Sequence, residues 1–325
     1  MTRCFVVWNK NSAERAQSTS GGMFSAIAND CLSKGGMVVA AKYGQGLRIE
    51  HGIAEHASDL NPMRGVKYVH GVIGKDVYAA VRRDLPRRHV AFFGLPCQCA
   101  AMRKMFGHNP NLLLVDLVCF GVPPISLWLK YVEWMERKHS KRLVSVNPRD
   151  KGRGWGRRTY YRYEWADGSA SLKLSLFDPY AQAFYSTLGF RRCCFSCPFR
   201  GIERQTDMTI GDCWGVEKMG LGLSDVEIKN GVSGVLVHNA RAQKIFDGLD
   251  VWSREINTEM LVRENLPIVA SPKMPEAWTE FSKDAENLDF GDLIEKWNLK
   301  ASRTRFVING IKSAARRVVG RIAIR

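Results

Sequence analysis

The sequence predicts an α/β fold with mixed sheets, a βαβ unit and a helical C-terminal tail. Three observations lead to this prediction. Short apolar runs alternate with segments of helical periodicity through the first part of the chain. Two of those runs, residues 89–94 and 111–118, flank a short helical segment and have the continuous apolar character of buried parallel strands. From residue 276 onward the spacing of apolar residues is helical, and the chain ends in a basic segment.

The elements before residue 86 follow from apolar periodicity and turn residues. A short apolar run opens the chain, and a Ser-Gly-Gly turn at residues 20–22 precedes a segment whose apolar positions recur at helical spacing. Glycines 35 and 36 end that helix. The predicted elements of this part are strands at residues 4–8, 37–43 and 47–56 and helices at residues 23–34 and 75–85.

The elements after residue 86 begin with the βαβ unit, whose helix covers residues 96–106. A long helix follows at residues 125–139, with its apolar side chains on one face. Two alternating runs around Ala166-Asp167-Gly168 have the signature of a β-hairpin. The remaining predicted elements are strands at residues 159–165, 169–176, 208–211 and 232–239 and helices at residues 178–188 and 240–249.

The composition describes a chain of 325 residues whose 45% hydrophobic content can fill one large core or two modest ones. Nine cysteines is an odd number, and the first residues lack the apolar core and cleavage site of a secretory leader. Free thiols in a reducing compartment are therefore favoured over a disulfide framework. No window approaches eighteen apolar residues, so we expect a cytoplasmic protein without a transmembrane helix.

The formal net charge of +16 is compatible with nucleic acid, anionic lipid or an acidic protein as a partner. Aromatic residues do not recur among the basic ones on one face, so we expect no nucleic-acid partner. Residues 301–325 carry seven Lys/Arg and no acidic residue. This basic amphipathic segment is compatible with peripheral membrane contact. A terminal helix packed on its own domain, or an unstructured basic end, is the favoured interpretation.

Four cysteines are candidates for one metal site. Cys194 and Cys197 form a C-x-x-C pair, while Cys97 and Cys119 each follow a strand of the βαβ unit. Because the carboxyl ends of parallel strands meet at one edge of a sheet, the fold should bring Cys97 and Cys119 together. Four thiolates suit an iron–sulfur cluster or a zinc ion. The cluster is favoured because compact zinc sites usually have two C-x-x-C pairs close in sequence. A cluster of this kind most often moves electrons.

The other five cysteines have less certain roles. Cys4 and Cys31 are expected to be buried apolar fillers. Cys99, Cys193 and Cys213 each stand beside a better-placed thiol, so any of them could replace a ligand.

Two motifs in the first part of the chain are candidate binding elements. Ser20 can cap the following helix, and Gly21 and Gly22 let backbone amides approach an anion such as a pyrophosphate. An ordinary capped helix explains so short a motif as well, and it is the favoured interpretation from spacing alone. The second motif could clamp phosphate and stack on a ring, or could form a solvated face, through Arg64, Lys67 and Tyr68.

These residues lie within seven ordered motifs that resemble the beta-subunit family of the hydrogenases and dehydrogenases that use the deazaflavin coenzyme F420. The resemblance extends from about residue 18 to about residue 266. The motifs are STSGGMFSAIA, MRGVKYVHG, VAFFGLPCQCAAMRK, LLLVDLVCFGVPP, NPRDKGRGW, CCFSCPFRGIERQTDMTIGDCWGVEK and GVSGVLVHN.

The resemblance implies an iron–sulfur flavoprotein with FAD and one 4Fe–4S cluster. By motif position it implies that the cluster ligands are Cys97, Cys119, Cys194 and Cys197. It favours flavin contact at both binding motifs, that is at Ser20, Gly21, Gly22, Arg64, Lys67 and Tyr68. It further implies a flavin-associated domain at residues 1–85, an iron–sulfur and flavin domain at 86–270 and a helical basic tail at 271–325.

The chain also departs from the family pattern. Many bacterial relatives carry an N-terminal ferredoxin-like segment, and this chain is expected to belong to the branch without it. Additional clusters would then come from another polypeptide, such as a ferredoxin-like redox partner. Cys213 stands where the G-D-F-W-G motif of the family has an aromatic residue.

The sequence as a whole predicts an oxidoreductase that passes electrons between a cluster and FAD, then as a hydride to or from an organic acceptor. The acceptor is the deazaflavin coenzyme or another small molecule. Asp212 and Arg204 flank the cluster loop and are candidates for tuning or substrate contact. Two alternatives remain open: a non-catalytic electron-transfer subunit of a larger complex, and a zinc-stabilised basic module that binds nucleic acid.

Overall fold

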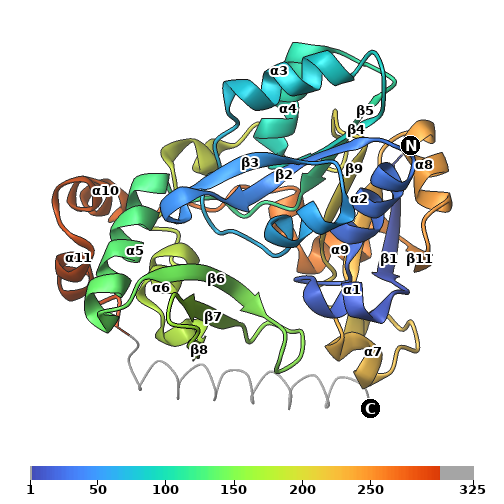
Figure 1. Ribbon diagram of the computed structural model, residues 1–325. Coiled ribbons are helices and arrows are strands. Elements are labelled where there is room, and N and C mark those ends of the chain that lie inside the picture. Colours follow the sequence, from blue (N-terminus) through green and yellow to red (C-terminus); the bar gives the residue numbers. More distant parts are fainter. Residues whose placement is uncertain (1, 301–325) are drawn as a thin grey trace, which may run out of the picture.

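The computed structural model describes residues 2–300, so the predicted basic tail at residues 301–325 lies outside the described residues. An eight-stranded mixed sheet carries helices on both faces, and a three-stranded sheet lies beside it (Figure 1). The strands are β1 (Arg3–Asn9), β2 (Met37–Tyr43), β3 (Ile49–Ala54), β4 (Val90–Gly94), β5 (Leu112–Leu117), β6 (Leu143–Asp150), β7 (Tyr160–Trp165), β8 (Ala170–Leu174), β9 (Met208–Asp212), β10 (Ser233–Val237) and β11 (Val251–Ile256). The α-helices are α1 (Ser12–Gln17), α2 (Met23–Ser33), α3 (Lys75–Asp84), α4 (Pro96–Phe106), α5 (Ile125–His139), α6 (Pro179–Tyr185), α7 (Asp225–Lys229), α8 (Ala240–Asp247), α9 (Thr258–Glu264), α10 (Trp278–Asn287) and α11 (Phe290–Lys296).

The eight-stranded sheet has the order β11-β1-β10-β9-β5-β4-β2-β3. Strands β2, β4, β5 and β9 are parallel to one another, and the outer strands pair antiparallel. The predicted βαβ unit is confirmed as β4-α4-β5. The predicted pairing of residues 37–43 with 47–56 is confirmed as β2 and β3, and the predicted hairpin as β7 and β8. The mixed α/β fold class is thus confirmed.

Both faces of the large sheet are covered by apolar helix surfaces. On one face, Ile27 of α2 and Phe246 of α8 pack in the same buried cluster as Val7 and Val235 of the sheet. On the other face, α3 and α4 cover β2 and β4, as seen above the sheet in Figure 1. Each fully buried side chain of this kind contributes about 1.5–3 kcal/mol. The parallel strands are therefore buried on both sides, as their continuous apolar sequences predict.

A second core joins β6 and β7 to helices α5, α6, α10 and α11. It is rich in aromatic residues, and a buried carboxylate lies at its centre. Asp178 caps α6 through the amide of Ala181 and accepts hydrogen bonds from the hydroxyls of Tyr131 (2.8 Å) and Tyr163 (2.7 Å). This carboxylate links the α5, β7 and α6 elements.

Several elements have no counterpart in the sequence prediction. Strand β6 is irregular against β7, and its sequence LVSVNPRD lacks a clean alternation, so the apolar period does not reveal it. Helices α1, α7 and α9 have five to seven residues, which is too short for a helical period to be recognised. Strand β11 is a solvent-facing edge strand next to β1.

The proposed division at residues 1–85, 86–270 and 271–325 remains a prediction. The eight-stranded sheet takes β1, β2 and β3 from one side of residue 85 and its other strands from the other side. Within residues 2–300 no helix has the length and apolar character needed to cross a membrane.

The Asp178 network gives a test of the second core. In Asp178→Ala the hydroxyls of Tyr131 and Tyr163 lose a buried acceptor and α6 loses its cap, so we expect the free energy of unfolding to fall by about 3 kcal/mol. Asp167→Ala removes a carboxylate from the exposed β7–β8 turn and should cost less than about 1 kcal/mol. Urea unfolding measures both. Equal losses in the two variants would contradict the assignment of Asp178 as the organising group.

Candidate functional site

Three parallel strands end at the same edge of the large sheet and deliver the chemically active side chains. Cys97 lies in the first turn of α4, directly after β4. Cys119 follows β5 by two residues, and Asp212 is the last residue of β9. The prediction that the fold brings Cys97 and Cys119 to one place is confirmed, because both line the same cavity.

Thiols dominate the smaller of two cavities at this edge, which has a volume of about 110 Å³. The cysteines that line it are Cys97, Cys119, Cys193, Cys194 and Cys197. The last three come from the 3₁₀ helix Arg192–Ser196 and the residue that follows it. The structure therefore brings together all four predicted ligands and adds one further thiol, that of Cys193.

Among residues 2–300, no group of three or more His, Cys, Asp or Glu side chains is arranged to hold a single metal ion. Four thiolates at about 2.3 Å from one zinc ion would lie only about 3.8 Å from one another. A cluster of four irons, each bound by its own thiolate, needs a wider spread. The donor set of this cavity, thiols alone, is that of an iron–sulfur cluster or of a structural zinc ion.

The other cysteines lie away from this cavity. Cys99 is fully buried in the core beneath α3 and α4. Cys213 is buried in another core together with Cys4, and Cys31 lies in the core under α2. Of the three ambiguous cysteines, only Cys193 lines the thiol cavity, and it is exposed at its rim.

Burial opposes ionisation of the Cys97, Cys119 and Cys194 thiols and raises their pKa values. It raises the pKa of Cys119 to about 12 and that of Cys194 to about 11. The positive charge of Arg200 lowers the pKa of Cys119, and the positive charge of Arg191 lowers the pKa of Cys194. Burial has the larger effect in both cases. Without a bound metal, these thiols are therefore protonated at neutral pH.

Arg204, a predicted site residue, lines the thiol cavity but is already paired. Its Nη1 lies 2.8 Å from the Asp116 carboxylate, and both side chains are almost fully buried. It also donates to the carbonyls of Gly201 (3.1 Å) and Ile268 (3.2 Å). Its guanidinium thus acts as a fixed charge beside the thiols.

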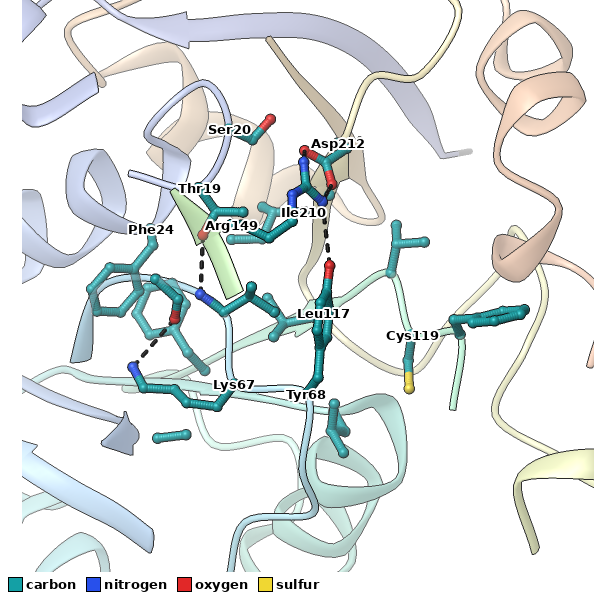
Figure 2. A pocket seen from close by; sticks show the side chains of 18 of the residues that line it. Thr19, Ser20, Phe24, Lys67, Tyr68, Leu117, Cys119, Arg149, Ile210 and Asp212 are labelled. Carbon is teal, nitrogen blue, oxygen red and sulfur yellow. Dashed lines mark hydrogen bonds and ion pairs between the residues drawn. The ribbon is translucent and has the colours of Figure 1, made fainter. Parts of the chain in front are cut away.

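The larger cavity has a volume of about 540 Å³, within the range of cofactor sites. Its walls are mostly apolar and aromatic, and Figure 2 shows Phe24 and Tyr68 on them. The two cavities adjoin, because five residues line both: Leu95, Cys119, Gly121, Val122 and Pro267. A ligand in the larger cavity would therefore lie next to the thiols.

The Ser-Gly-Gly turn lies at the edge of the larger cavity, which Ser20 and Gly22 line. The prediction that Ser20 caps α2 is wrong: its hydroxyl donates to the carbonyl of Val232 at 2.7 Å. Gly22 is the N-cap residue, at φ +89°, and no side chain caps the helix. The first amides of α2 therefore remain free of a side-chain cap and can bind an anion. Gly21 lies outside the lining, and a Cβ there would come within 2.6 Å of the Val7 carbonyl oxygen.

The second predicted binding motif also lines the larger cavity, but two of its side chains are engaged. Arg64 forms an ion pair with Glu14 at 2.6 Å. Lys67 donates to four carbonyls of its own loop at 2.9–3.2 Å, and burial lowers its pKa to about 7. Tyr68 stacks on Phe184, with ring centroids 4.3 Å apart. This motif therefore contributes the ring of Tyr68 to the cavity wall. The side chains of Arg64 and Lys67 hold the loop in place.

Asp212, the other predicted catalytic residue, lines the larger cavity as part of an ion pair. Arg149 of β6 lies 2.8 Å from one of its carboxylate oxygens, and Trp155 donates to the other at 2.8 Å. Arg149 also donates to the Tyr68 hydroxyl at 3.4 Å (Figure 2) and lies over the ring of Trp214. Sequence reasoning missed Arg149 and Trp155, although both belong to the motif NPRDKGRGW.

A further polar residue in the wall, His51 of β3, was also missed. Burial lowers its pKa to about 4, although the carbonyls of Val72 and Phe93 act in the opposite direction. The ring stacks on Phe92 and is neutral at physiological pH. No sequence signal singles out one histidine within a strand.

Comparison with known proteins identifies a family and a similar fold. The family model for the C terminus of the coenzyme F420 hydrogenase/dehydrogenase beta subunit matches residues 87–261. A chain of the F420-reducing nickel–iron hydrogenase complex from Methanosarcina barkeri, solved with xenon, is similar in fold. The TM-score is 0.50 at 14% identity, over 90% of this chain and 91% of that chain. No curated protein matches the chain.

The Arg149–Asp212 pair gives a test of the larger cavity. Arg149→Met leaves a mostly buried carboxylate without its cation, so we expect the free energy of unfolding to fall by about 3–5 kcal/mol. The double variant Arg149→Met/Asp212→Leu should lose less than the sum of the single variants, because neither charge is left alone. Arg158→Met changes an exposed arginine of the same segment and serves as the control. Additive losses would show that the two charges are not coupled.

Proposed function

Because the chain belongs to the coenzyme F420 hydrogenase/dehydrogenase beta-subunit family, we propose that it is an oxidoreductase with a 4Fe–4S cluster and FAD. The family is one of redox subunits. The main support for these two cofactors is the wall that the two cavities share, in which Cys119 lines both. A cluster and a flat cofactor held in these cavities would lie next to each other.

The chemistry of the smaller cavity supports the cluster. We assign Cys97, Cys119, Cys194 and Cys197 as its ligands, with Cys193 as the one alternative. Four thiolates and their cluster carry a net negative charge. The basic residues that line the same cavity can compensate this charge, and they are Arg191, Arg200 and Arg204. The buried Nε of Arg200 has no hydrogen-bond partner among residues 2–300, which fits an acceptor supplied by the bound group.

The lining of the larger cavity supports FAD. The uncapped N-terminus of α2 suits a pyrophosphate, and the stacked rings of Tyr68 and Phe184 suit a flat ring system. We propose that Ser20, Gly22 and Tyr68 contact the flavin. The other residues of the two motifs hold the turn and the loop in position without contacting the flavin, and they are Gly21, Arg64 and Lys67.

The division of labour follows from the two cofactors. A cluster exchanges single electrons, whereas FAD collects two and releases them as a hydride. Cys119 in the shared wall keeps the distance between the two cavities short. The apolar rings of the larger cavity exclude water from the flavin position. Asp212 is engaged by Arg149 and Trp155. Its proposed role is therefore to fix the position of the Arg149 charge in the cavity wall, and not to donate a proton.

The proposed acceptor is a small organic molecule, either the deazaflavin coenzyme or another hydride carrier. A redox partner protein, ferredoxin-like or otherwise, would exchange electrons with the cluster. A non-catalytic electron-transfer subunit is the main alternative, and it would hold both cofactors without reducing a small acceptor. We further propose a cytoplasmic location, since the thiols need a reducing compartment.

Anaerobic purification tests the proposal directly. Iron, sulfide and flavin assays on the purified protein should give about four irons per chain together with FAD. The absorbance spectrum should contain both chromophores. Stoichiometric zinc in place of iron after anaerobic reconstitution would exclude the electron-transfer function.

The ligand assignment predicts which cysteines retain iron. Alanine at Cys97, Cys119 or Cys197 should remove most of the iron and the brown colour, because each supplies one of four ligands. Cys99→Ala is the matched control, since this cysteine lies on the same helix as Cys97 but outside the cavity. Comparison of Cys193→Ala with Cys194→Ala identifies the fourth ligand. Iron loss in the Cys99 variant that equals the loss in the Cys97 variant would contradict the assignment.

The flavin assignment predicts the effect of removing a cavity ring. A substituent at Gly22 would point at Asn9 and not into the cavity, so Phe24 is the cleaner target. Phe24→Ala should weaken FAD binding at least tenfold, or about 1.4 kcal/mol, because a stacking surface is lost. Tyr78→Ala removes a half-buried ring of α3 outside the cavity and should leave the affinity unchanged. Flavin titration of apoprotein measures both, and equal affinities would place the flavin elsewhere.

A further inference from the structure

Arg200 lines the thiol cavity, and its hydrogen bonds are incomplete. It follows the C-x-x-C pair by three residues, and its Nη1 and Nη2 donate to the carbonyls of Pro267 (2.5 Å) and Phe120 (3.0 Å). These two bonds fix the plane of the guanidinium. Its Nε is buried and has no hydrogen-bond partner among residues 2–300. A buried N–H without an acceptor is unfavourable, so the site fits a missing acceptor.

The charge of Arg200 is also uncompensated. Arg204 in the same cavity pairs with Asp116, whereas Arg200 has no carboxylate within 4.0 Å in the described part of the chain. Arg200 is half-buried, and charges that are withdrawn from water are normally paired. Arg200 lines the same cavity as Cys119, and its Nη2 donates to the carbonyl of Phe120, the residue that follows Cys119. Both observations indicate an anion at the thiols.

We propose that Arg200 donates its Nε–H to a sulfur of the cluster and thereby raises the reduction potential of the cluster. The acceptor is either the thiolate of Cys119 or a bound sulfide. Reduction adds one electron and makes the bound group one unit more negative, so a fixed cation and its hydrogen bond stabilise the reduced form more than the oxidised form. Arg200 is a tuning residue that acts on the cluster potential, and this role rests on the proposed cluster.

A redox titration of the anaerobically purified protein tests this role. In Arg200→Gln the reduction equilibrium constant of the cluster should fall at least tenfold, which for a one-electron couple is a shift of 59 mV to lower potential. Arg200→Lys keeps the charge without the planar fork and should shift less. Arg192→Gln is the matched control, because this arginine is exposed on the same loop and does not line the cavity.

Hyperfine spectroscopy adds a readout of the bond itself. Protein labelled with ¹⁵N-arginine should show a nitrogen coupling to the reduced cluster that disappears in Arg200→Gln and persists in Arg192→Gln. An intact cluster in Arg200→Gln at the parent potential would overturn the inference while leaving the proposed function in place. If the Arg200→Gln variant does not retain iron, the test uses Arg200→Lys and the parent protein. An unchanged cluster potential in Arg200→Lys, together with no nitrogen coupling in the parent, then overturns the inference. A parent protein without a cluster would overturn the proposed function as well.

Discussion

The parallel pairing of β4, β5 and β9 is the constraint on which the whole site depends. Gly94 lies opposite Asp116, and Leu117 lies opposite Ile210, so the three strands end at the same level of the sheet. The segments that follow them must therefore meet at one edge. This register brings together groups that are far apart in the sequence, and the 3₁₀ helix with the C-x-x-C pair completes the ring of thiols.

Charge is the second organising factor at this edge. Buried ion pairs contribute little net stability, because desolvation offsets their attraction, but they fix geometry. The Arg204–Asp116 pair lies beside the thiols and the Arg149–Asp212 pair beside the larger cavity. Each joins segments more than 60 residues apart. Arg204 and Arg149 hold the walls through their ion pairs, whereas the buried Nε of Arg200 has no hydrogen-bond partner among residues 2–300.

The sequence predicts those features that depend on local pattern or on a general rule of topology. Apolar runs predict β4 and β5, and the edge rule for parallel strands predicts that Cys97 and Cys119 meet. Features that depend on long-range partners are not predictable in this way. Ser20 has the chemistry of a cap, but its hydroxyl binds a carbonyl 212 residues away. The sequence marks Asp212 as a candidate site residue, but its pairing with Arg149 depends on the irregular strand β6.

The larger cavity is lined by residues of the eight-stranded sheet and by Arg149 of the three-stranded sheet. Arg149 from β6 meets Asp212 of β9, and the next segment places Lys151 against the carbonyl of Ser20 at 2.8 Å. On the other side, Tyr68 stacks on a ring of α6, which belongs to the second core. The walls therefore belong to both units, and any displacement of one against the other would open the cavity. A ligand that contacts both walls must stabilise their docked arrangement, since it binds that arrangement more tightly than an open one.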